Sequence, residues 1–318
     1  MRRHLSQWVL IPVLLTIMTS SCKEIFEPSI AKHDVELLSP ADNYISNKYT
    51  LVFWVEPIDD ALFYRLQVVS PDFDDVGALI LDTLINTNKF SFTFDPGEYQ
   101  WRVSAENGSS KTAYSRPRSF IVNYSSIEQQ RVILSSPVNN LITNHANIAF
   151  KWMALFGADQ YRLQIDTNNF ADENALLVNK LTSNIEMIEV LTRDHVYHWR
   201  VRAETDTVQS LWSMVNSIRF DTTPPGRVSL KTPLKGETLN LPVILQWNTV
   251  LSAKKYKLYA LKSDSSSLFD TDFPLLLNGT NYTFNRGRAD DSIYWRVSAI
   301  DEAGNEGESS ELRNFILR

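Results

Sequence analysis

Cysteine is almost absent from this chain of 318 residues, because Cys22 is the only one. A lone thiol cannot form an internal disulfide, and a structural zinc site needs several thiolate or imidazole ligands at short spacing. The sequence therefore excludes both of these common uses of cysteine. An excess of basic residues is missing as well, since 31 lysines and arginines stand against 37 acidic residues, for a net charge of −6. This balance argues against nucleic acid as a partner.

Long apolar runs are also missing. The one oily stretch covers residues 8–18, which is too short for a helix that crosses a membrane, since such a helix needs about 20 residues. This stretch follows Arg2 and Arg3 and precedes small polar residues, which is the layout of a secretory signal peptide. Cleavage directly before Cys22 would make this cysteine the new N-terminus.

The sequence carries none of the common signatures of catalysis. It has no G-x-S-x-G elbow, H-E-x-x-H helix, P-loop or cysteine nucleophile. Paired aspartates fall in predicted loops and have no counterpart in other parts of the chain, as is typical of solvated turns: Asp59-Asp60, Asp74-Asp75 and Asp290-Asp291. The acidic stretch 301–308 lacks the spacing of a calcium loop and is better explained as a hairpin turn. We therefore predict that the chain is not an enzyme and has no metal or cofactor.

The sequence does contain a threefold repeat. Its copies can be aligned at Pro40, Pro137 and Pro233, which gives periods of 97 and 96 residues. Each copy has two tryptophans, separated by 47, 47 and 48 residues: Trp54 and Trp101, Trp152 and Trp199, Trp247 and Trp295. A fixed period indicates one structural unit used several times. We predict that all six tryptophans lie in the cores of these units.

Within each copy the apolar residues alternate with polar ones. In the second copy Ile148, Phe150 and Trp152 occupy every other position, and the segment 197–203 shows the same pattern. Strict alternation predicts strands with one face in a core and one face in water. Several such strands in about 95 residues, with turn residues between them and no long helical pattern, indicate a β-sandwich.

The repeated residues resemble bacterial fibronectin type III domains. The resemblance rests on a tryptophan that ends the second strand, Tyr-x-Leu on the third strand, and Tyr-x-Trp-Arg-Val-x-Ala on the sixth. It implies an all-β chain of three tandem fibronectin type III or immunoglobulin-like β-sandwiches, at residues 35–123, 131–221 and 227–318. The third copy differs in one place, where Ile293 takes the inward position of Tyr99 and Tyr197. Two joints connect these units. The first, residues 123–131, is polar and is expected to bend, whereas the two prolines of the second, residues 222–227, should stiffen it.

The segment that ends at Cys22 is similar to the lipobox of bacterial lipoproteins, including those of Bacteroidetes. This resemblance implies a signal peptide at residues 1–21, diacylglycerol on Cys22, a tether at residues 22–34 and the membrane as a partner. Two or more acyl chains anchor a protein essentially permanently. The expected location is the outer membrane of the bacterial cell envelope, on either its periplasmic or its surface face. Ordinary cleavage nearby, which would leave a free or buried thiol, is the alternative.

Trp212 is the one tryptophan outside both the signal and the predicted cores. Its "LWS" context aligns with "AYS" at Tyr114, so the residue is interpreted either as a half-buried cap on the edge of the sandwich or as a ligand contact. The function predicted from the sequence is a non-enzymatic, lipid-anchored binding or spacer protein, with an unidentified protein or glycan partner. The alternatives are a glycan-binding surface lipoprotein of a sugar-uptake system and an accessory subunit of an enzyme or secretion complex.

Overall fold

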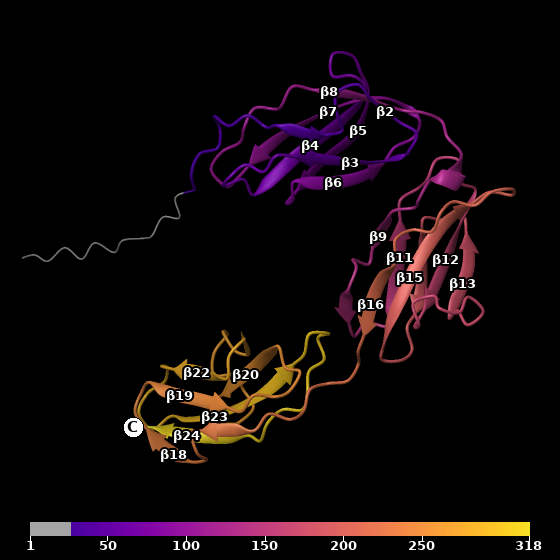
Figure 1. The fold of residues 1–318 in the computed structure, drawn as a ribbon. Helices are drawn as coiled ribbons and strands as arrows, with labels where there is room; N and C mark the ends of the chain where they lie inside the picture. Colours follow the sequence, from indigo (N-terminus) through magenta and orange to yellow (C-terminus); the bar gives the residue numbers. More distant parts are fainter. Residues whose placement is uncertain (1–26) are drawn as a thin grey trace, which may run out of the picture. The chain divides into compact units, whose positions relative to one another are not determined.

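The computed structural model describes residues 27–318 (Figure 1). Cys22, the predicted signal peptide and the start of the tether lie outside the described residues. The described strands fall into three successive groups, β1–β8, β9–β16 and β17–β24, and each group forms one three-stranded and one five-stranded sheet. We call these groups the first, second and third sandwich. The chain is therefore all-β, with tandem fibronectin type III-like sandwiches, as the repeat predicted.

The second sandwich shows the strand order. Its three-stranded sheet has the order β14 (Glu186–Val190), β11 (Asn147–Trp152), β9 (Leu134–Ser136). Its five-stranded sheet has the order β10 (Leu141–Thr143), β16 (Asn216–Phe220), β15 (His195–Glu204), β12 (Gln160–Asp166), β13 (Val178–Thr182). Strand β10 pairs with β16 in parallel, and the other pairs are antiparallel.

The other two sandwiches repeat this order. The first has β1 (Leu37–Ser39), β3 (Thr50–Val55), β6 (Lys89–Thr93) in one sheet and β2 (Tyr44–Ser46), β8 (Arg118–Val122), β7 (Gly97–Glu106), β4 (Phe63–Pro71), β5 (Val76–Ile85) in the other. The third has β17 (Leu230–Thr232), β19 (Val243–Trp247), β22 (Asn281–Phe284) in one sheet and β18 (Glu237–Leu239), β24 (Arg313–Leu317), β23 (Ser292–Ile300), β20 (Lys255–Leu261), β21 (Leu275–Leu277) in the other.

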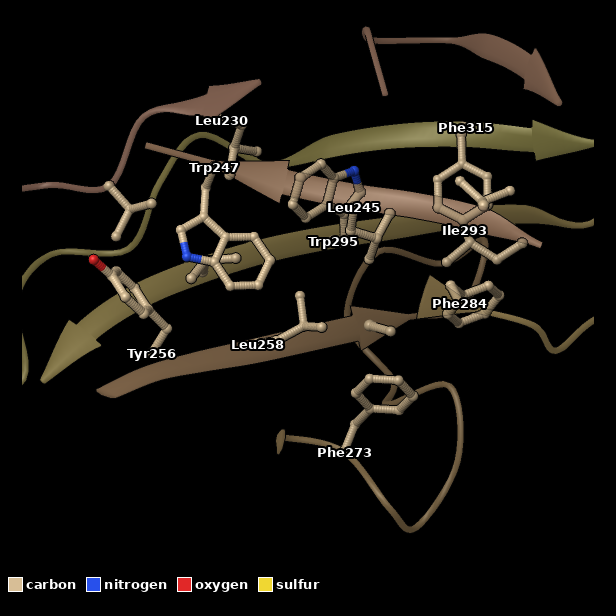
Figure 2. Packing of buried hydrophobic residues seen from close by; sticks show 14 of the residues in the cluster. Leu230, Leu245, Trp247, Tyr256, Leu258, Phe273, Phe284, Ile293, Trp295 and Phe315 are labelled. Atoms are coloured by element: carbon tan, nitrogen blue, oxygen red, sulfur yellow. The ribbon is translucent and has the colours of Figure 1, made fainter. Parts of the chain in front are cut away.

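Each core is built on one strand of its five-stranded sheet, β7, β15 or β23, which we call the long strand. In the second sandwich Trp199 is fully buried and meets Phe150 edge-on, with ring centres 5.0 Å apart. Phe53 and Trp101 repeat this contact at 5.0 Å in the first sandwich. In the third core the rings of Trp247, Trp295, Phe284 and Phe315 lie between the strands (Figure 2). Ile293 is fully buried there, as the sequence predicted.

Trp54 corrects the prediction that all six repeat tryptophans are core residues. Trp101, Trp152, Trp199, Trp247 and Trp295 are buried, but Trp54 is 39% exposed and lies beneath the ammonium group of Lys89, 4.1 Å from its ring centre. On β3 it is Val55 that points inward. Because the side chains of a strand alternate in direction, a position one residue away from the inward one faces solvent.

The first joint contains a short 3-10 helix, Ile127–Gln129, capped by the hydroxyl of Ser126. The next residue, Gln130, is buried. Its side-chain oxygen accepts a hydrogen bond from the amide of Tyr49 at 3.0 Å, and its amide nitrogen donates one to the carbonyl of Asn47 at 2.8 Å. These hydrogen bonds of Gln130 could not be predicted from the polar composition of the joint, because a glutamine in a polar stretch resembles any solvated residue.

The second joint lies against the hairpin that follows β23. The side-chain amide of Asn305 donates a hydrogen bond to the carbonyl of Asp221 at 2.8 Å. At Gly307 a Cβ atom would lie 2.3 Å from the carbonyl oxygen of Pro225, so only glycine permits this approach of the two backbones. Within residues 27–318 no helix is long and apolar enough to cross a membrane.

Candidate interaction site

In every sandwich a serine hydroxyl group holds the segment that follows the long strand against that strand. It accepts a hydrogen bond from the amide of the central valine of that strand, at 3.0 to 3.2 Å, in three pairs: Val103 with Ser115, Val201 with Ser213, Val297 with Ser310. In the second sandwich this bond fixes the residues on either side of Ser213. Trp212 is one of them.

Trp212 stacks with two guanidinium groups. The side chains of Arg200 and Arg202, which point outward from β15, lie with their guanidinium carbons 4.2 and 4.5 Å from the centre of its ring. Arg200 also lies 4.1 Å from the ring of Phe170. Cation–π contacts contribute about 0.5–1 kcal/mol at exposed sites and about 2 when desolvated. Trp212 is half-buried, and it is a member of this stack rather than a bare aromatic platform.

The first sandwich contains a shorter version of the same stack. Arg102 lies between Phe73 and Tyr114, at 4.1 and 4.3 Å from their ring centres. The sequence alignment of Tyr114 with Trp212 therefore matched equivalent positions. It did not identify the arginines as partners, although the Tyr-x-Trp-Arg pattern places one of them on the outward face of each long strand.

Acidic and amide groups hold the two arginines in place. Arg200 donates hydrogen bonds to Gln164 at 2.8 Å and to Glu173 at 2.7 Å. Glu204 accepts hydrogen bonds from Arg202 at 2.7 Å and from Arg162 at 2.6 Å. Burial by itself raises the pKa of Glu204, but the hydrogen bonds and charges of the two arginines outweigh it and lower the pKa below its ordinary value. The carboxylate therefore stays ionised and keeps the stack ordered.

An apolar groove lies beside this stack. Leu211 and Met214, the neighbours of the fixed Trp212–Ser213 pair, are 43% and 75% exposed. Together with residues 131–134 they line a groove of about 410 Å³. Lys48 and Arg131 add two cations to its lining, and Arg131 also donates a hydrogen bond to the carbonyl of Trp212. Sequence reasoning missed these residues, because a single exposed Leu or Met carries no pattern.

The acidic segments considered from the sequence are turns in the structure. Asp60 and Asp290 have positive φ angles of 63° and 68°, as turn residues do. The carboxylate of Asp301 accepts hydrogen bonds from the amides of Gly304 and Asn305, both at 2.8 Å, which closes the hairpin after β23. Among residues 27–318 no three His, Asp or Glu side chains gather in a way that could hold a metal ion.

No protein-family model matches the chain, and no curated protein matches it. Among solved structures it is similar to chicken CNTN1 FN1–FN3 domains, with 15% identity, a TM-score of 0.41, and coverage of 90% of this chain and 97% of that one. It is also similar to the fibronectin(III)-like modules of Clostridium thermocellum CbhA, with 11% identity, a TM-score of 0.39, and coverage of 59% of this chain and 94% of that one. Domains A168–A170 from titin match with 14% identity, a TM-score of 0.38, and coverage of 89% and 97%. The order and register of the strands establish the sandwich fold.

Proposed function

We propose that this chain is a non-enzymatic binding or spacer protein of the bacterial cell envelope, anchored to the outer membrane through lipid on Cys22. Tandem fibronectin type III-like sandwiches are consistent with an interaction or spacer module. The observation that carries the binding role is the pair of exposed apolar residues, Leu211 and Met214, which lie on either side of the fixed Trp212–Ser213 pair at the edge of the groove. A surface that is already ordered loses less conformational entropy when it binds.

The partner that this groove fits is a protein segment with an apolar side chain between acidic residues. Leu211, Met214 and residues 131–134 would contact the apolar side chain. Lys48 and Arg131, the cations in the lining, would attract the acidic residues. A glycan partner is less well supported, because a sugar cannot stack on the ring face of Trp212 that a guanidinium group already occupies.

A photo-crosslinking amino acid at Met214, in the full chain in its own cells, tests the binding role. We expect a protein adduct from this position and none from the same amino acid at Leu251, which is 93% exposed in the third sandwich. Adducts at both positions, or at neither, would contradict a binding surface at the groove. An adduct whose added mass is removed by glycosidases would instead identify a glycan partner.

The lipid anchor has a separate test. Cys22→Ser removes the one thiol in the chain, so we expect it to abolish incorporation of labelled fatty acid and to release the protein from the membrane fraction. Cys22→Ser protein that still partitions into detergent and sediments with membranes would sink the anchor hypothesis. The crosslinking result does not depend on this outcome.

A further inference from the structure

The second sandwich has a cleft between its two sheets, at the end where β12 finishes and β15 begins. The cleft has a volume of about 600 Å³. The most deeply buried residues of its lining are Ile165, Leu191 and Tyr197, which are 1%, 3% and 5% exposed. Clefts that bind small molecules have volumes of about 300–1,000 Å³. Polar groups form slightly more of the lining of this cleft than apolar groups do, which suits a ligand with both an apolar and a charged part.

Glu189 in this cleft differs from the residues at the equivalent position of the other two sandwiches. Glu189 on β14 lies opposite Ile148, and in the third sandwich the equivalent pair is Phe284 opposite Val243. Phe284 is fully buried in the third core (Figure 2). The first sandwich has Phe92 at this place, in contact with Phe94, with ring centres 4.9 Å apart. The carboxylate side chain of Glu189 therefore stands where the other two sandwiches carry an aromatic ring.

The loop after β12 leaves the cleft open as well. In the third sandwich the equivalent loop turns Phe273 inward, where it is 3% exposed and lies 6.4 Å from Phe284 between ring centres (Figure 2). In the second sandwich Phe170 from this loop is instead engaged by Arg200. Neither of the two aromatic fillers of the third core is thus present in the second.

The charges around the cleft leave one group unmatched. Both carboxylate oxygens of Glu189 accept hydrogen bonds from the ammonium group of Lys180, at 2.6 and 2.9 Å, so the pair is neutral as a whole. Arg193 lies at the rim, and within residues 27–318 its guanidinium group has no hydrogen bond or ion pair. Only its backbone is engaged, with the hydroxyl of Tyr197. An arginine fork binds a carboxylate through two parallel hydrogen bonds.

We propose that this cleft binds a small carboxylate with an apolar body. The apolar body lies on Ile165, Leu191 and Tyr197, and the carboxylate lies at the rim, where Arg193 binds it. His195 and Thr192, also in the lining, offer further hydrogen bonds to its oxygens. This site is separate from the groove at Met214, so either can fail while the other stands.

The test uses hexanoate and its neutral analogue hexanamide as probes, with the full chain in detergent and titration calorimetry as the readout. We expect hexanoate to bind, and to bind more tightly than hexanamide. Glu189→Phe restores the ring of the other two sandwiches and should weaken hexanoate binding at least tenfold. Because all variants share one detergent, partitioning of the probe into micelles cancels. A thermal melt of each variant shows whether it is folded.

Arg193→Gln is the second variant, and its exposed position makes misfolding a minor concern. It should weaken hexanoate binding about tenfold, which corresponds to one charged hydrogen-bonded contact, and leave hexanamide unchanged. Arg288→Gln is the matched control, since Arg288 lies in the loop before β23 of the third sandwich, and it should leave both probes unchanged. Absence of hexanoate binding, binding that survives Glu189→Phe, an equal loss of both probes in Arg193→Gln, or a loss in Arg288→Gln would each overturn the proposal.

Discussion

The first and second sandwiches carry a tryptophan at the same distance before the tryptophan of the long strand, and yet the two residues have opposite environments. Trp152 on β11 is 2% exposed and Trp54 on β3 is 39% exposed. Lys151 is the residue that corresponds to Trp54 in strand register, and Val55 corresponds to Trp152. An equal spacing between residue types therefore does not decide which face a side chain occupies. The phase of the alternation along the strand decides it.

Truncation of Trp152 should give the largest contrast. Trp152→Ala removes a buried ring and leaves a cavity, so the second sandwich should lose about 3–5 kcal/mol of stability. Hydrogen exchange resolved by sandwich is the measurement, and the first and third should keep their protection because each has its own core. Simultaneous loss of protection in all three would contradict independent sandwiches.

Val55→Ala tests whether Val55 fills the core position of the first sandwich that Trp152 fills in the second. Val55 is 3% exposed, and the loss of two buried methyl groups should cost about 2 kcal/mol. The free energy of unfolding of the first sandwich, from denaturant titration, measures the change. An effect no greater than that of a surface substitution would place the core elsewhere on β3.

Glu204→Gln removes the charge that holds the stack of the second sandwich, and the resulting loss of stability should depend on pH. Because the pKa of Glu204 is lowered in the folded state, its stabilisation is complete above the ordinary glutamate pKa and is lost as the pH falls through the lowered value. At pH 7 the variant should lose about 1–2 kcal/mol in the second sandwich, and the difference from the native chain should shrink below about pH 4. Glu106→Gln, at the equivalent place on β7, is the control. An unchanged difference at pH 3 would exclude ionisation of Glu204 as its cause.

The smallest effect is expected for Trp54→Ala. Its loss should stay below about 1 kcal/mol, since the variant gives up an exposed ring and one contact with Lys89. A thermal melt of the first sandwich, beside Trp152→Ala as the reference, is enough to detect it. A cost comparable with that of Trp152→Ala would mean that Trp54 is covered in solution.

The fold was predictable because the same strand pattern occurs three times in the sequence. Alternation on the long strands and the position of Ile293 followed from the pattern, since each core face repeats every second residue. The prediction that Trp54 lies in the core was wrong. Equal spacing between tryptophans does not fix the phase of the alternation along β3, which the buried Leu51 and Phe53 set. The groove at Met214 and the cleft at Glu189 were not predictable in the same way. Each depends on which side chains meet across sheets and loops, and a single carboxylate in a strand resembles an ordinary solvent-facing residue.

One shared feature of the three sandwiches has a mechanical consequence. In each, a short strand near the start pairs in parallel with the last strand: β2 with β8, β10 with β16, β18 with β24. Tension applied along the chain pulls two parallel neighbours in opposite directions along their axes. Their hydrogen bonds are then loaded together in shear and do not open one after another as in a zipper. Each sandwich would therefore resist a force applied between its own first and last strands until these hydrogen bonds give way together.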